Sequence, residues 1–218
     1  MDIKIEDFLP KYRDTQKSSN PLFNPYTDKN FYKSLYYKKE FYDEKLPRIE
    51  AIPTEPGQLF KHQKIISRFL SSHTLYNELL LAHSMGTGKS CSAIGVVEQI
   101  RREGGKFKGA LVLAPGKGLL DNFVQEIALK CTHNKYLPDN YSSIRGEKNR
   151  MHALRQAVKN FYKFRTYMTF AKDIERMIVK NIPKDDPNRE EKMYKNIRES
   201  FSNLIIIMDE VHHIRPKP

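Results

Sequence analysis

The sequence predicts an α/β fold in which helices cover both faces of a parallel sheet. Three observations support this prediction. Short apolar runs, typical of strands buried on both sides, alternate with stretches of helical periodicity. A glycine-rich turn at residues 83–90 joins one apolar run to a helix, and an acidic pair, Asp209 and Glu210, directly follows another apolar run. Ligands of such folds bind where parallel strands end, so both features are candidate site elements.

The chain divides by composition into two parts. It carries a formal charge of +12, but residues 1–50 hold ten Lys and Arg against nine Asp and Glu, so the surplus lies in residues 51–218. We therefore expect an aromatic and lysine-rich extension over 1–50 and one domain over 51–218. A basic domain suits a polyanion such as nucleic acid, although a lysine-rich composition alone gives the same charge.

Neither a membrane segment nor a secretion signal is visible in the sequence. No apolar run approaches the roughly 18 residues that a spanning helix needs, and the N-terminus lacks the apolar core of a signal peptide. Two cysteines, Cys91 and Cys131, predict no disulfide framework. We expect a soluble, cytoplasmic protein in a reducing compartment, not a secreted one.

The extension is rich in aromatic residues, eight of which lie within 23–42. The spacing of Phe31 and Leu35 predicts a short helix over 28–42, capped by Asp28. Two uses of the rings remain open. They pack the extension onto its own domain or, together with the interleaved lysines, they stack on bases.

Helices and strands alternate in the domain that follows a proline-containing linker. Helical periodicity or an apolar run defines each element. The expected elements are a helix over 61–70, a strand over 78–83, a helix over 89–102, a strand over 110–114, a helix over 119–130, a helix over 147–161, a strand over 165–169, a helix over 170–179, a polar surface excursion over 181–192 and a strand over 204–208.

The segment His-Ser-Met-Gly-Thr-Gly-Lys-Ser at 83–90 has the pattern of a phosphate-binding loop, except that histidine replaces the first glycine. Gly86 and Gly88 let the backbone turn and bring its amides close to phosphate oxygens. The helix that starts here favours an anion at its N-terminus. Lys89 is expected to reach the outer phosphates, and the Ser90 hydroxyl to bind Mg²⁺.

The second candidate element is Asp-Glu-Val-His at 209–212. A strand end projects these side chains to the carboxyl edge of the sheet. Asp209 is expected to hold Mg²⁺, directly or through water, and Glu210 to orient and deprotonate an attacking water. His212 is placed to couple hydrolysis to a facing domain. The two elements together predict a site that binds ATP with Mg²⁺ and hydrolyses it.

Two further features are candidates for ligand contact. Gln63 carries an amide donor and acceptor that suit an adenine edge, although a helical glutamine is usually solvated. Residues 145–165 hold seven Lys and Arg and one acid. A helix over 147–161 would align some of them beside an apolar face, where they follow a phosphate backbone or form a solvated surface. The members of this basic stripe are Lys148, His152, Arg155 and Lys159.

These residues resemble the first RecA-like lobe of a superfamily 2 helicase or translocase, over about residues 59–215. The resemblance implies Lys89, Glu210 and His212 as candidate catalytic residues. It implies Ser90 and Asp209 as Mg²⁺ ligands, and Gln63, Met85, Gly86, Thr87, Gly88, Lys89 and Ser90 as nucleotide-binding residues. The matching segments are Gln63 for the adenine-reading glutamine, 83–90 for motif I, 110–115 with Leu119 and Leu120 for motif Ia, 166–170 for the segment before motif II in Snf2-like members, and 209–212 for motif II, a DExH box.

The sequences Met-Gly-Thr-Gly-Lys-Ser, Thr-Tyr-x-Thr-Phe and Asp-Glu-Val-His-His-Ile-Arg are also similar to helicases of large nucleo-cytoplasmic DNA viruses. That group includes the poxvirus early transcription factor small subunit and nucleoside triphosphate phosphohydrolase I. The resemblance implies a role in viral transcription with a viral RNA polymerase as partner, and a location in the host cytoplasm or the virion. The sequence leaves both nucleic-acid tracks open, with DNA favoured over RNA.

Such enzymes use two lobes, the second of which supplies arginine contacts to the γ-phosphate. This sequence ends at Pro218, before motif III, so we expect an incomplete lobe, either a fragment or one whose partner lobe lies on another chain. Alone it is expected to hydrolyse ATP poorly, because loss of an arginine finger costs roughly three to five orders of magnitude in rate. The alternatives are a non-catalytic nucleotide-binding module docked on a larger assembly, a replication or repair helicase, and a P-loop kinase, which has no use for Asp-Glu-x-His.

Overall fold

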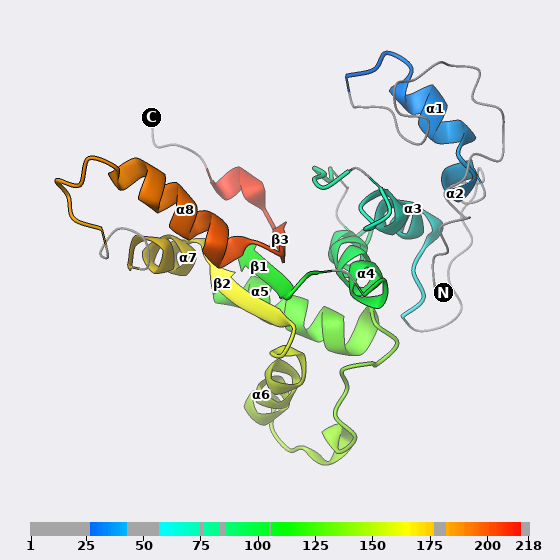
Figure 1. Cartoon of the computed structure of the whole chain (residues 1–218). Coiled ribbons are helices and arrows are strands. Elements are labelled where there is room, and N and C mark those ends of the chain that lie inside the picture. The colour runs from blue at the N-terminus through cyan, green and yellow to red at the C-terminus, as the bar shows by residue number, and fades with distance from the viewer. Residues whose placement is uncertain are drawn as a thin grey trace. The chain divides into compact units, whose positions relative to one another are not determined.

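The computed structural model divides the chain into two compact units (Figure 1). The first unit comes from residues 1–105 and 129–135, and the second from 106–128 and 136–218. The expected boundary at residue 50 lies outside the described residues and stays a prediction. The described residues are 27–42, 57–74, 76–82, 86–104, 106–176 and 182–214.

Helices dominate the described part of the first unit. α3 and α4 pack against each other at Gly95, where an added Cβ would lie 2.9 Å from the hydroxyl oxygen of Ser67 on α3. α4 has the predicted bounds, and Gly104 follows it with a φ of +70°, the left-handed conformation that commonly ends a helix. The helices are α1 (Phe31–Tyr37), α2 (Lys39–Tyr42), α3 (Lys61–Phe69) and α4 (Lys89–Arg102) (Figure 1).

An aromatic cluster joins α1 and α2 to the end of α3. Phe31 and Phe41 are buried against Phe69 and Tyr76. The rings of Phe69 and Tyr76 stack with their centroids 4.3 Å apart, and the Phe31 ring meets both edge-on. The prediction that the extension packs onto its own domain is confirmed for these two phenylalanines.

The predicted single helix over 28–42 is wrong in detail. Lys38 adopts an extended conformation between α1 and α2. Asp28 does not cap a helix that starts beside it, because its carboxylate accepts the N–H of Asn30 at 2.8 Å, and α1 begins only after Asn30. The Tyr32 side chain is 82% exposed, so for this ring base stacking stays a prediction.

The predicted strand before the phosphate loop does not form within the described residues. Residues 78–82 adopt neither helix nor strand, and Leu80 is 79% exposed. An apolar run becomes a buried strand only when neighbouring strands pair with it and cover it. The described residues of the first unit contain no other strand with which this run could pair.

Cys91 and Cys131 form a disulfide, so the expectation of unpaired cysteines is wrong. The two residues are 40 positions apart in sequence, but the fold brings their Cα atoms within 5.3 Å, a separation that suits the bond. Nearby, Lys135 and Glu98 form an ion pair of 2.7 Å. Both links connect α4 to the segment 129–135.

The second unit contains a parallel sheet, which confirms the predicted α/β class. Its strands are β1 (Gly109–Ala114), β2 (Tyr162–Thr166) and β3 (Leu204–Met208), in the order β2-β1-β3 (Figure 1). Val112 on β1 lies opposite Phe164 on one side and Ile207 on the other. The helices are α5 (Lys117–Gln125), continued by a π-helical turn (Glu126–Lys130), α6 (Glu147–Val158), α7 (Tyr167–Ile174) and α8 (Arg189–Phe201).

The two most apolar strands differ in burial. All six residues of β1 are buried, because β1 has a strand on each side and contacts α5 and α7. β3 is paired on one side only among the described residues, and Ile206 and Met208 are 45% and 46% exposed. The expectation that a fully buried strand precedes the acidic pair is therefore wrong.

Several element boundaries in the second unit differ from prediction. α5 starts at Lys117 rather than at 119, α6 ends at Val158 rather than at 161, and α7 covers Tyr167–Ile174 rather than 170–179. The strand expected over 165–169 ends at Thr166, whose hydroxyl accepts the N–H of Thr169 and caps α7. Residues 189–192, expected in a surface excursion, form the first turn of α8, a helix with no fully buried residue. Met193, Ile197 and Phe201 recur at helical spacing along α8 and are half-buried.

Candidate functional site

α4 positions the side chains of the phosphate loop. Gly86 and Gly88 have φ angles of +82° and +76°, in a backbone region that residues other than glycine rarely adopt. Gly88 is the N-cap of α4, so Lys89 and Ser90 stand in its first turn. A Cβ at Gly86 would meet nothing within 4 Å, which leaves room beside the loop backbone. A helix N-terminus, with its dipole and a lysine in the first turn, fits a triphosphate. Met85 lies outside the described residues.

α3 contacts the phosphate loop through the side chain of Gln63, which is buried, with 2% of its surface exposed. The Gln63 Oε1 accepts the N–H of Phe60 at 2.9 Å, and its Nε2 donates to the carbonyl of Gly88 at 3.1 Å. The His62 Nε2 lies 3.3 Å from the carbonyl oxygen of Thr87. A Cβ at Gly88 would approach the Gln63 Nε2 to 2.5 Å, so the contact requires glycine. The Gln63 amide thus fixes the loop, and its reading of adenine stays a prediction.

The acidic pair follows β3 in the second unit. The N–H of Asp209 continues the sheet ladder and donates to the carbonyl of Leu113 at 2.9 Å. Glu210 has a φ of +52° and is the N-cap of a 3₁₀ turn over Val211–His213. A left-handed conformation is rare for a residue with a long side chain, and such strain clusters at functional sites.

Two side chains accompany the acidic pair. The Nδ1 of His212 lies 3.2 Å from the Oε2 of Glu210. The hydroxyl of Tyr167 donates to the carbonyl of Asp209 at 2.7 Å. Burial, followed by the nearby carboxylates of Asp209 and Glu210, raises the pKa of Tyr167, so its hydroxyl keeps its proton at neutral pH.

Sequence reasoning placed Tyr167 in a strand and gave it no role. The signal that identifies it is its position directly after β2, at the sheet edge where β3 also ends. The structure thus brings Gln63 to the phosphate loop across 25 residues and Tyr167 to Asp209 across 42 residues. The phosphate loop belongs to the first unit and the acidic pair to the second, and we call them the phosphate half-site and the acidic half-site.

The basic stripe predicted on α6 forms in part. Leu154 and Val158 are buried, as the neighbouring apolar face requires. Arg155 forms an ion pair with Asp121 of α5, which neutralises one cation of the stripe. The remaining exposed members are Lys148, His152 and Lys159.

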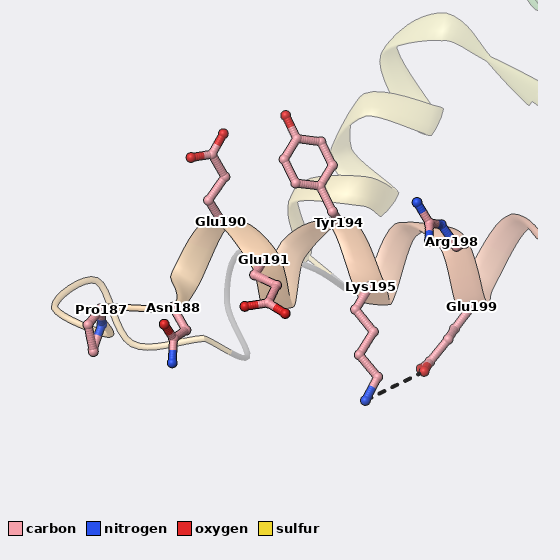
Figure 2. Close-up of a pocket in the computed structure, with 8 residues that line it drawn as sticks. All are labelled: Pro187, Asn188, Glu190, Glu191, Tyr194, Lys195, Arg198 and Glu199. Atoms are coloured by element: carbon pink, nitrogen blue, oxygen red, sulfur yellow. Dashed lines mark ion pairs between the residues drawn. The ribbon is translucent and has the colours of Figure 1, made fainter.

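Two hollows of the described surface involve neither half-site. One, of about 710 Å³, lies along α8 and is lined by side chains of this helix and of the two residues before it, including the Lys195–Glu199 ion pair of 4.0 Å (Figure 2). The other, of about 300 Å³, lies along the C-terminal half of α4 in the first unit. Arg102 and Lys135, which line the second hollow, already bond to neighbouring side chains.

The chain resembles known viral proteins. It is 39% identical over 166 residues to "Putative helicase 009L" of Frog virus 3 (isolate Goorha), a match that covers 76% of the chain and 16% of that protein. It is 35% identical over 224 residues to "Putative helicase 087L" of Invertebrate iridescent virus 3, covering 99% of the chain and 20% of that protein. "Putative ATP-dependent RNA helicase L377" of Acanthamoeba polyphaga mimivirus is 28% identical over 220 residues, a match that covers 86% of the chain and 19% of that protein.

The chain therefore spans about a fifth or less of the length of these three relatives. No solved structure matches it. Among the described helices, none has the length and apolar character needed to cross a membrane. Residues 56–217 match the family model ResIII, described as "Type III restriction enzyme, res subunit". The chain thus belongs to the ResIII helicase family, and it corresponds to the N-terminal region of a superfamily 2 helicase. Proteins of this family bind ATP.

Proposed function

We propose that the chain is the ATP-binding lobe of a nucleic-acid-dependent ATPase, a helicase or translocase of the DExH type. The phosphate half-site carries the proposal. Two left-handed glycines, at 86 and 88, lie directly before a 14-residue helix whose first turn presents Lys89 and Ser90. This arrangement offers backbone amides, a helix N-terminus and a cation to one polyphosphate.

Each half-site has its own task in this proposal. Lys89 and the loop amides bind the phosphates, while the Ser90 hydroxyl and the Asp209 carboxylate hold Mg²⁺, for which oxygen ligands are suited. When bound, the metal polarises phosphoryl oxygens as a Lewis acid. Glu210 orients the attacking water and accepts its proton. His212, beside Glu210, relays the state of the site to a facing domain.

The complete activity requires partners beyond these residues. We propose a second RecA-like lobe, on the same or another chain, that supplies arginine contacts to the γ-phosphate. A formal charge of +12 and the exposed cations of α6 support nucleic acid as the track.

A role in viral transcription, with DNA as the track and a viral RNA polymerase as partner, rests on the short motifs shared with the poxvirus group. The viral origin of the relatives supports a location in the host cytoplasm or the virion. The Cys91–Cys131 disulfide fits the virion better than the reducing cytoplasm.

The test is ATP hydrolysis by the full-length protein, without nucleic acid and with duplex DNA or RNA. We expect turnover that DNA stimulates and that Lys89→Ala abolishes, and we expect the 218-residue chain alone to bind MgATP with little turnover. Turnover that survives Lys89→Ala in full would remove the site assignment.

Two other functions give different results in the same assay. Tight MgATP binding without any turnover in the full-length protein would favour a non-catalytic nucleotide-binding module. Stimulation by RNA instead of DNA would favour an RNA track, as the printed name of the mimivirus relative has it for that protein. Separation of paired strands would favour a replication or repair helicase.

A further inference from the structure

The main chain of Asp209 is held on both of its sides. Its N–H donates to the carbonyl of Leu113. Leu113 and Met208 are the last paired residues of β1 and β3, so Asp209 extends this pairing by one residue. Its carbonyl accepts the hydroxyl proton of Tyr167 at 2.7 Å. The first bond fixes the peptide plane before the Asp209 Cα, and the second fixes the plane after it. Because a peptide unit is planar, the two bonds together set the direction of the Cα–Cβ bond of Asp209.

We propose that Tyr167 is a positioning residue, which aims the Asp209 carboxylate at the metal of the acidic half-site by holding the Asp209 carbonyl. This inference rests on the proposed function, since it assumes that Asp209 binds Mg²⁺. Tyr167 touches neither the nucleotide nor the attacking water in this account, and acts only through the main chain of Asp209.

The position of Tyr167 in the fold explains how it reaches Asp209. It is the first residue of α7, directly after β2, whereas Asp209 follows β3, and β1 lies between these two strands. The Thr166 hydroxyl caps α7 through the N–H of Thr169 and so fixes where the helix starts. The Tyr167 side chain therefore links the ends of the two outer strands across the end of β1.

The same bond bears on Glu210. The peptide unit that carries the Asp209 carbonyl also carries the nitrogen of Glu210, where the chain enters its left-handed conformation with a φ of +52°. Glu210 then begins the 3₁₀ turn in which the N–H of His213 donates to the Glu210 carbonyl at 3.0 Å. One hydroxyl thus holds the peptide unit shared by the proposed metal ligand and the proposed base.

The test compares Tyr167→Phe with Tyr194→Phe in the full-length protein. Each substitution removes one hydroxyl and keeps the ring, and the Tyr194 ring on α8 is 63% exposed (Figure 2). The Mg²⁺ concentration that gives half-maximal ATP hydrolysis is measured together with kcat and the melting temperature. A fluorescent ATP analogue titrated with Mg²⁺ gives a second measure of metal affinity that needs no turnover.

We expect Tyr167→Phe to raise the half-maximal Mg²⁺ concentration and to lower kcat, each roughly three- to tenfold, as the loss of one hydrogen bond predicts. Tyr194→Phe should leave both values unchanged. A lowered melting temperature with an unchanged Mg²⁺ dependence would mean that Tyr167 is merely structural and would overturn the inference, as would a Tyr167→Phe protein identical to wild type.

Lys89→Ala, measured in parallel, separates this inference from the proposed function. Full turnover in Lys89→Ala would remove the proposed function itself. Loss of turnover in Lys89→Ala, beside wild-type behaviour of Tyr167→Phe, would remove only the role of Tyr167.

Discussion

The phosphate half-site and the acidic half-site are held in different ways. The phosphate loop lies at the start of a long helix, has its turn fixed by two glycines, and receives a hydrogen bond from the buried Gln63. The acidic pair follows a half-exposed strand, and the Tyr167 hydroxyl that holds it comes from a part-buried side chain. The first half-site is therefore formed by helix geometry and buried contacts, and the second by a few contacts near the surface.

This difference predicts a division of labour. Backbone amides at the start of a long helix bind phosphate with little rearrangement, so substitutions in the phosphate half-site should affect the binding of MgATP. Substitutions in the acidic half-site should leave nucleotide binding largely intact and reduce turnover. The comparison fails if substitutions in both half-sites change binding and turnover in the same proportion.

Glu210→Gln should give the largest effect on turnover. It keeps the size of the side chain but removes the proton acceptor, which should lower kcat in the full-length protein by roughly a hundred- to ten-thousandfold. The dissociation constant for MgATP should change little. Glu199→Gln on α8, in the same unit, is the matched control. A weakened MgATP affinity equal to the loss in kcat would contradict the division between the half-sites.

Lys89→Ala comes next and should affect both quantities. Loss of the cation from the first turn of α4 should lower kcat at least roughly a hundred- to a thousandfold, to the background of the assay, because it removes one stabilising charge or donor. Calorimetric titration should also show weaker MgATP binding. Lys130→Ala, an exposed lysine in the π-helical turn, should leave both values unchanged.

Gln63→Ala should have the smallest effect and distinguishes two roles of this side chain. Removal of its two hydrogen bonds should lower the free energy of unfolding by about 1–3 kcal/mol, measured by denaturant titration. If Gln63 acts by holding the loop, the affinities for ATP and GTP should fall in the same proportion. A selective loss of ATP affinity would instead support direct reading of adenine.

A matched variant, Gln63→Glu, sharpens this comparison. The carboxylate keeps an acceptor for the N–H of Phe60 but cannot donate to the carbonyl of Gly88. We expect it to weaken MgATP binding at least as much as Gln63→Ala does. Wild-type affinity in Gln63→Glu would show that the bond to Gly88 does not matter for the loop.

Local sequence rules predicted the bounds of α4 and the two glycine turns before it. Periodicity and the glycines at its two ends gave α4 its bounds, because helix starts and stops depend on residues within about four positions of each other. The positive φ of Gly86 and Gly88 also follows from residue type, since only glycine adopts it without strain. The apolar runs that form β1 and β3 were visible for the same local reason.

Local rules placed Asp209 and Glu210 directly after a strand, but they did not predict the partial exposure of that strand or the pairing of distant residues. Gly-Ala-Leu-Val-Leu-Ala and Leu-Ile-Ile-Ile-Met are similarly apolar, yet only the first is fully buried. The apolar run Leu-Leu-Leu-Ala at 79–82 forms no strand. An apolar run indicates that a segment prefers burial, whereas the strands beside it determine whether the segment is buried.

The sequence by itself determined the α/β class, the phosphate loop and the acidic pair, because each depends on residue type and on neighbours close in the chain. Only the tertiary structure decided that Gln63 binds the loop backbone, that Cys91 meets Cys131 and that Tyr167 holds Asp209. These contacts join residues 25, 40 and 42 positions apart. The order of strands and the packing of helices set such distances, and no spacing rule along the chain encodes them.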